Sequence, residues 1–165
     1  MIAHYQAIIQ RIRLEIEEIE RTQAAVQRHW HSAKTSSADQ DAFVNSVALN
    51  LHSFYSGLER IFELIAIEID GGRLGGEEGW HSELIRQMTL DLPNIRPPML
   101  RQDTAEQLDE YRKFRHWIRN IYTTHLDPKQ MEPLIDKLPV FWEKTRSELT
   151  TFIEFLEQLA QSDSE

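Results

Sequence analysis

The chain has 165 residues, of which 41% are hydrophobic, so it has the size of one domain and can bury a packed core. It contains no cysteine, which excludes disulfides, thiolate chemistry and cysteine-based zinc sites. The net charge of −9 argues against a protein that coats duplex nucleic acid, but it leaves room for a small basic pocket that binds a few phosphates.

The start of the chain is charged from Arg11 onward and lacks the pattern of a signal peptide. No stretch is long and apolar enough to predict a membrane-spanning helix. We therefore expect a soluble, cytoplasmic protein that does not associate with a membrane.

Apolar residues recur three and four positions apart along most of the chain, which is the spacing of amphipathic helices. This spacing predicts a long first helix over roughly residues 3–33. A second helix follows a cap at Ser37 or Asp39 and ends at residues 70–72, where two glycines follow an aspartate. Its apolar stripe is the widest, so we expect this helix to lie centrally with neighbours on more than one side.

A glycine-rich loop leads to a short predicted helix over residues 80–90, and the prolines that follow predict an extended crossing segment at residues 93–100. The next helix is expected to start near Asp103 or Thr104. It should run through Ile121 and end before Pro128.

The last helix has a clear start signal in Asp127 and Pro128, because aspartate caps helices and proline suits the first turn. We expect a break or kink at Pro139 and a frayed tail over residues 162–165. With no β-type alternation and no internal repeat, the sequence predicts one all-α domain over residues 1–161. This domain is a bundle of about five mostly antiparallel helices, with room for a homodimer interface.

Polar side chains are densest in the segment YRKFRHWIRNIYTTHLD, residues 111–127, and any chemistry is expected to centre on Phe114 to Tyr122. Several positive or titratable groups fall within about two turns, namely Arg112, Lys113, Arg115, His116 and Arg119. On a helix, Arg115, Arg119 and Tyr122 share one face, and His125 would join it if the helix reached that far. His116 and Asn120 share the adjacent stripe.

Clustered arginines repel one another, and a bound anion would offset that cost. Their planar donor forks suit phosphate, and histidine exchanges protons near neutral pH. Such a face could bind a phosphodiester and assist attack by a neighbouring ribose hydroxyl. The alternative is that the arginines pair with Glu or Asp on other helices, since the chain has 27 acidic residues, and charge spacing alone favours that structural role.

The segment FRHWIRNIY resembles the core motif of HepT-like proteins, ribonuclease toxins of the HEPN superfamily, in which four residues separate an arginine from a histidine and a tyrosine follows two positions later. Arg115 and Tyr122 match the first and last positions, and Asn120 stands where the family has histidine. The segments FYSGLERIFELIAIEID, GWHSELIRQM, RPP and LD are also similar to the family, so the resemblance covers roughly residues 43–156.

The resemblance implies a HEPN-like helical bundle that dimerises and forms a composite cleft where the two motif helices meet. It implies an endoribonuclease that needs no metal or cofactor, in a type VII-like toxin–antitoxin pair. The antitoxin would be a minimal nucleotidyltransferase that adds AMP to the motif tyrosine. Arg115 would then bind or polarise the scissile phosphate of RNA, and Tyr122 would support the site and accept AMP.

Asn120 departs from the family pattern, because an amide cannot exchange protons near pH 7. Three interpretations follow. The protein is a weakened or inactive toxin that serves as an RNA- or protein-binding module, or His116 replaces the missing group, or the working pair is Arg119 and His125. We prefer the register with Arg115 because it also places Tyr122 where the family has it.

His81 lies at the predicted start of the short helix, next to Trp80. The two residues either cover a pocket or anchor the preceding loop, and we favour the structural role. The loop GGRLGG has no Walker lysine pattern and follows a helix, which argues against a phosphate-binding P-loop.

Overall fold

The computed structural model describes residues 1–72 and 78–163. These residues form five α-helices, one short 3-10 helix and no strand beyond an isolated bridge between Leu92 and Arg96, which confirms the predicted all-α fold. The helices are α1 (Ile2–Thr35), α2 (Gln40–Glu68), α3 (Trp80–Met88), α4 (Gln102–Arg119), η1 (Thr123–His125) and α5 (Pro128–Ser162). The middle of the predicted glycine-rich loop and residues 164–165 of the predicted tail lie outside the described residues.

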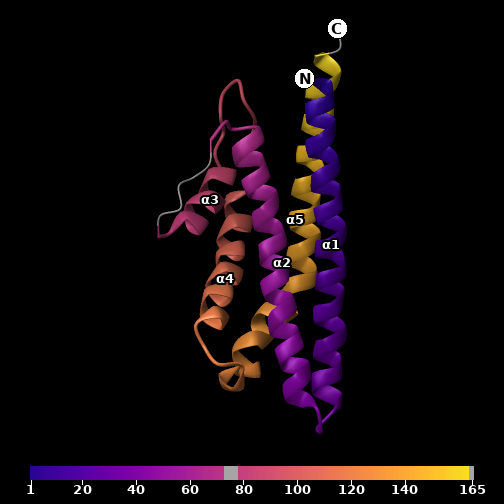
Figure 1. Cartoon of the computed structure of the whole chain (residues 1–165), viewed down its shortest axis with the longest axis vertical. Coiled ribbons are helices and arrows are strands. Elements are labelled where there is room, and N and C mark those ends of the chain that lie inside the picture. The colour runs from indigo at the N-terminus through magenta and orange to yellow at the C-terminus, as the bar shows by residue number, and fades with distance from the viewer. Residues whose placement is uncertain (73–77, 164–165) are drawn as a thin grey trace.

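The arrangement places α2 at the centre of the bundle (Figure 1). Helix α1 packs along one side of α2 as an antiparallel hairpin, while α3 and α4 contact its other side. Helix α5 runs alongside α1, so that both chain ends lie at the same end of the molecule. The central position predicted for the second helix is therefore confirmed.

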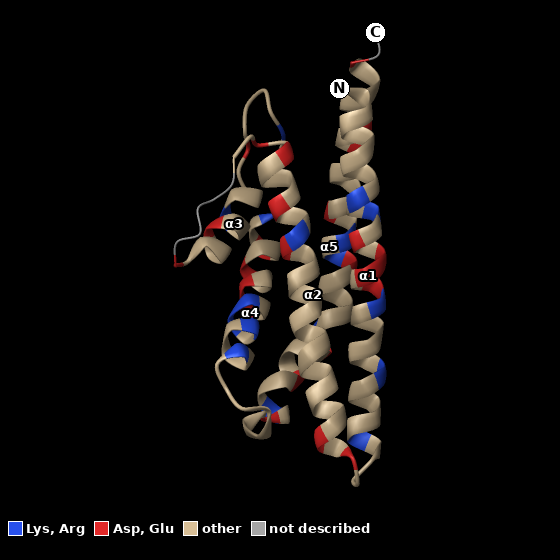
Figure 2. Ribbon diagram, in the orientation of Figure 1, with Lys and Arg blue, Asp and Glu red and all other residues tan. Residues whose placement is uncertain are grey.

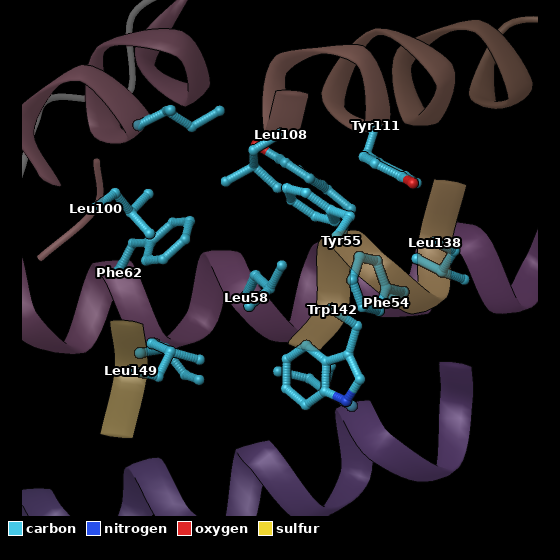
Figure 3. Close-up of a cluster of buried hydrophobic side chains, with 14 of the residues drawn as sticks. Phe54, Tyr55, Leu58, Phe62, Leu100, Leu108, Tyr111, Leu138, Trp142 and Leu149 are labelled. Atoms are coloured by element: carbon cyan, nitrogen blue, oxygen red, sulfur yellow. The ribbon is translucent and has the colours of Figure 1, made fainter. Parts of the chain in front are cut away.

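An aromatic cluster joins α2, α4 and α5 (Figure 3). The ring of Phe54 lies 5.6 Å from Tyr111 and 5.9 Å from Trp142 between ring centres. Tyr111 stacks on Phe141 and donates its hydroxyl to the carbonyl of Leu134 at 2.9 Å. Because aromatic side chains bury large apolar areas, this cluster holds α4 firmly against α2.

Gly57 allows α1 and α2 to approach closely. A Cβ atom at this position would lie 2.7 Å from Cγ1 of Ile19, which is closer than van der Waals contact allows. Glycine is otherwise unfavourable in a helix by about 1 kcal/mol. Glycine is nevertheless required at this position, because the side chain of Ile19 on α1 occupies the space that a Cβ atom would fill.

A buried ion pair fixes the crossing segment to the end of α2. Arg96 donates from Nε and Nη2 to the two carboxylate oxygens of Asp70, at 2.6 and 2.8 Å. It also donates to the carbonyls of Gln87 and Leu90. This clamp ties the end of α3 to α2 and so sets where α3 lies relative to the central helix.

Helix α4 ends earlier than the sequence predicts. It stops at Arg119, and Asn120 donates its side-chain amide to the carbonyl of His116 at 2.7 Å. Asparagine competes for backbone groups in this way and ends helices. The prediction that the helix runs through Ile121 is therefore wrong, and the backbone of Tyr122 is extended.

Helix α5 starts as predicted, with the side chain of Asp127 accepting the backbone N–H of Lys129 at 3.0 Å. It then runs without interruption to Ser162, so no break occurs at Pro139. Figure 1 shows the change of direction expected at an internal proline, because the first turns of α5, in orange, run obliquely to the rest.

Candidate active site

The last two turns of α4 border a recess with a volume of about 320 Å³. Its lining side chains come from α3 and from the end of α4, and they are His81, Arg112, Arg115, His116, Arg119 and Asn120. Figure 2 shows the basic residues gathered along this part of α4 in an otherwise acidic chain. We refer to this site as the basic recess.

Two of the clustered cations, Arg112 and Lys113, form ion pairs. Nε of Arg112 lies 2.5 Å from the Asp109 carboxylate, and Nζ of Lys113 lies 3.4 Å from the same group. Arg112 and Lys113 are therefore paired, but with a carboxylate of their own helix, whereas the structural alternative predicted partners on other helices.

Arg115 and Arg119 differ from Arg112 in their partners. Arg115 donates from Nε to the hydroxyl of Ser56 at 3.4 Å, and its guanidinium carbon lies 6.0 Å from the centre of the Tyr55 ring. Within the part of the chain that the structure describes, no carboxylate lies within salt-bridge distance of either arginine. Two of the cations that line the recess thus remain available to an anion.

The two arginines also affect the pKa of His52 on α2. Burial lowers the pKa of His52 from its ordinary value of 6.5, and the positive charges of Arg115 and Arg119 lower it further, against an opposite effect of Glu59. A positive potential that disfavours a protonated histidine also favours a phosphate. The region around the basic recess is therefore suited to an anion despite the acidic chain.

A buried carboxylate lies behind the recess. Glu59 on α2 is 7% exposed, and its Oε2 accepts hydrogen bonds from the hydroxyl of Tyr55 at 2.7 Å and from Nδ1 of His81 at 2.6 Å. Burial and the nearby Glu59 raise the pKa of Tyr55, so the phenol keeps its proton and acts as a donor. The ring of His81 also packs against Trp80, with ring centres 3.8 Å apart.

The comparison with family models gives one result that bears on identity. The model described as HepT-like protein matches residues 46–156, a segment that includes α3, α4 and the whole basic recess. The chain belongs to the HepT-like family. Comparisons of this HepT-like protein with curated proteins and with solved structures give no match.

The structure brings together five of the residues predicted for the site, which are Arg115, His116, Arg119, Asn120 and His81. Two others lie apart from the recess. Tyr122 is 78% exposed, and its ring meets that of His125 edge-on at 5.9 Å. Both follow the end of α4, so the shared helical face predicted for Tyr122 and His125 does not form.

Sequence reasoning missed Glu59 and Tyr55 in this HepT-like protein. The signal was a carboxylate in the most apolar helix, four residues after a tyrosine, because residues four apart on a helix are neighbours. What the sequence could not show was that His81, from another helix, completes the group. A buried charge is costly unless it is hydrogen-bonded, and the hydrogen bonds of Glu59 with Tyr55 and His81 offset that cost here.

An apolar pocket of about 270 Å³ adjoins the basic recess and shares Arg119 with it. Leu49 on its rim is 65% exposed. The remaining lining residues are Asn45, Ala48, His52, Ile118, Ile121, Thr123 and Leu126. We refer to this site as the apolar pocket.

Two further features concern ligands and membranes. Within residues 1–72 and 78–163, no three His, Asp or Glu side chains converge in a way that could hold a metal ion. In the same residues, no helix has the length and hydropathy needed to cross a bilayer. The prediction of metal-independent chemistry stays a prediction.

Proposed function

We propose that this HepT-like protein is the toxin of a type VII-like toxin–antitoxin pair and cleaves RNA without a metal. The observation that carries the proposal is the basic recess, in which Arg115 and Arg119 have no carboxylate partner among the described residues. The recess lies on the segment that carries the family motif. Its donors suit one phosphodiester of a flexible RNA strand better than a duplex surface.

The reaction that suits these residues is transfer of a phosphodiester to the neighbouring 2′-hydroxyl. Arg115 and Arg119 would bind the non-bridging oxygens and stabilise the charge that develops on them. The 2′-oxygen forms a bond to phosphorus as the bond to the 5′-oxygen breaks, which gives a 2′,3′-cyclic phosphate and a free 5′-hydroxyl. A proton leaves the 2′-hydroxyl and another reaches the 5′-oxygen, so no oxidant or water is consumed.

A second copy of the chain is part of the proposal. The apolar pocket and exposed Leu49 lie beside the basic recess, and an exposed apolar area next to a polar site is typical of an interface. Two copies packed there would bring their recesses together as the composite cleft that the family resemblance implies.

Tyr122 is the proposed acceptor of AMP from a minimal nucleotidyltransferase antitoxin. With 78% of its surface exposed and its position beyond the end of α4, its hydroxyl is open to a second enzyme. An AMP group attached there would place a phosphate on the segment that directly follows Arg119 in the chain, where it could compete with RNA for the arginines.

The test of the enzyme proposal is cleavage of single-stranded RNA by the purified protein in the presence of a chelator. Arg115→Ala should lower the rate by about 100-fold or more, the usual effect of removing a group that stabilises the developing charge. The matched control is Arg28→Ala, which removes an exposed arginine from α1 and should leave the rate unchanged. Equal activity of wild type and Arg115→Ala, or none in either, would overturn the proposal.

The modification has an independent test. Incubation with a HepT-partner nucleotidyltransferase and ATP should raise the intact mass by one AMP group, and Tyr122→Phe should abolish the increase. Tyr5→Phe, which alters a partly buried tyrosine on α1, serves as the control. An unchanged mass of the wild-type protein counts against the AMP-transfer proposal alone.

One observation favours a second candidate function, a module that binds RNA or protein without cleaving it. The side-chain amide of Asn120 is engaged with the carbonyl of His116, so the position where the family has histidine contributes a helix end rather than a proton-transfer group. Tight binding of RNA without cleavage, lost in Arg115→Ala, would identify this function.

A further inference from the structure

His81 lines the basic recess and contacts a buried carboxylate. It comes from α3 rather than from the motif helix. Its Nδ1 lies 2.6 Å from Oε2 of Glu59, while the ring lines the recess. Glu59 is 7% exposed and Tyr55 donates to the same oxygen. Three side chains from two helices thus converge behind the phosphate site.

We propose that His81 is the proton-transfer residue of the basic recess and that Glu59 is its positioning residue. This inference rests on the proposed cleavage of RNA and names the residue that performs the role left open by Asn120. Sequence reasoning favoured a structural role for His81, and the geometry now points to a chemical one.

The geometry selects one form of the imidazole. A carboxylate accepts hydrogen bonds, so Nδ1 carries a proton and donates it to Glu59. Nε2 is then the basic nitrogen, and it has no hydrogen-bond partner among the described residues. This is the arrangement by which a buried carboxylate orients a histidine base and stabilises the imidazolium that forms.

The surroundings hold the ring in place. Tyr55 fixes the Glu59 carboxylate from within α2, and Trp80 packs on the His81 ring at 3.8 Å. An imidazole that cannot rotate keeps its free nitrogen aimed in one direction, which lowers the entropic cost of proton transfer.

The charged groups that face His81 come from two elements. Glu59 on α2 is hydrogen-bonded to Nδ1 of His81, while the arginines of α4 line the same recess and attract the phosphate. The other titratable residue in the recess is His116, an exposed side chain without a carboxylate partner in the described part of the chain. Only His81 combines access to the recess with a buried carboxylate.

Nε2 of His81 takes the proton of the 2′-hydroxyl as the 2′-oxygen attacks phosphorus. The bond from phosphorus to the 5′-oxygen breaks, and that oxygen takes a proton from solvent. His81 later returns its proton to solvent, so the residue ends the cycle unchanged.

The experiment measures cleavage and binding separately across a range of pH. Wild type, His81→Ala, His81→Gln and Glu59→Gln are compared on RNA, and binding is measured with the same strand carrying 2′-deoxyribose at the cleaved position. The control is His31→Ala, an exposed histidine on α1. His81→Gln keeps a polar side chain of similar size in case His81→Ala unfolds, and thermal melting checks all variants.

Loss of His81 should lower kcat by about 10²–10⁴-fold and remove the rise of the rate with pH that a histidine base produces, while Kd for the deoxy strand changes less than about threefold. Glu59→Gln should lower kcat by about 100-fold or more through the wrong tautomer, again with Kd unchanged. A merely structural role would instead weaken binding and lower the melting temperature without changing the shape of the pH profile.

Two results separate this inference from the proposal beneath it. If His81 variants cleave at the wild-type rate while Arg115→Ala is inactive, His81 is not the base and the proposed function stands. If folded wild type does not cleave RNA at all, the proposed function fails and the role of His81 fails with it.

Discussion

At the scale of single residues, the cluster of positive charges is tolerated because it lies at the C-terminal end of α4. Arg115, His116 and Arg119 occupy the last two turns of α4, where the helix dipole favours positive charge. That effect offsets part of their mutual repulsion without using a carboxylate. The arginines therefore stay available to a ligand while the helix remains stable.

His52 carries a testable consequence of this positive potential. Its pKa is lowered in the folded protein by burial and by Arg115 and Arg119, so below about pH 6.5 the unfolded chain binds more protons than the folded one. The free energy of unfolding should fall as pH drops through this window toward the folded pKa. His52→Gln should flatten the slope between about pH 7 and pH 5.

Urea denaturation at a series of pH values measures this effect. His31→Gln, which changes an exposed histidine on α1, is the control and should keep the wild-type slope. An identical slope for His52→Gln and wild type would show that neither burial nor the arginines lower the pKa of His52 in the folded state.

At the scale of elements, two contacts set the positions of the helices. One uses a glycine inside a helix and the other a buried pair of charges, and both features are usually unfavourable. A glycine in the middle of α2 lets α1 approach, and a buried ion pair joins α2 to the crossing segment. The close approach at Gly57 sets the position of α1 against α2. The ion pair positions α3, and through it the ring of His81.

Gly57→Ala should destabilise the protein by about 1–3 kcal/mol, although alanine is the better helix former, because the new Cβ would overlap Cγ1 of Ile19. The cost should shrink in an Ile19→Ala background, where the space is free. A double-mutant cycle by urea denaturation measures the difference, and additive effects would contradict this view of the α1–α2 contact.

Asp70→Asn should cost about 3–5 kcal/mol, since it leaves the buried guanidinium of Arg96 without a charged partner. The control is Glu83→Gln, which breaks the exposed pair with Arg86 and should cost about 1 kcal/mol or less. The same urea titrations compare them. Similar costs for both variants would mean that the clamp adds no net stability.

At the scale of the whole molecule, the basic recess and the apolar pocket adjoin and share Arg119. The exposed Leu49 lines the apolar pocket together with Ile118 and Ile121, and contiguous apolar surface beside a polar site is typical of an interface. We propose that two copies assemble through this side of α2 and α4, with each copy bringing its arginines toward the other.

Leu49→Asp should therefore shift a dimer toward monomer by about tenfold or more in Kd, because it places a charge in an apolar interface. Light scattering across a concentration series measures the shift. The control is Leu14→Asp, which alters a leucine of α1 that is also exposed, at 52%. Wild-type protein that is monomeric at every concentration, or equal effects of both variants, would count against this interface.

The sequence by itself determined the helices and the family. Apolar spacing, caps and prolines act over a few residues, so the all-α fold, the central α2 and the start of α5 at Pro128 could be predicted. The motif segment and the family were also identifiable, because both depend on order along the chain. The end of α4 was placed too late, since one asparagine side chain decided it. The end of α3 was also placed too late, because this helix ends at Met88 rather than at residue 90.

The tertiary structure decided which of those residues form a site. Glu59 and His81 lie in different helices, and their contact depends on how α3 packs on α2. The same packing left Tyr122 exposed and outside the recess. Convergence of distant residues follows from the sum of many packing contacts rather than from local preference, so spacing along the chain could not reveal it.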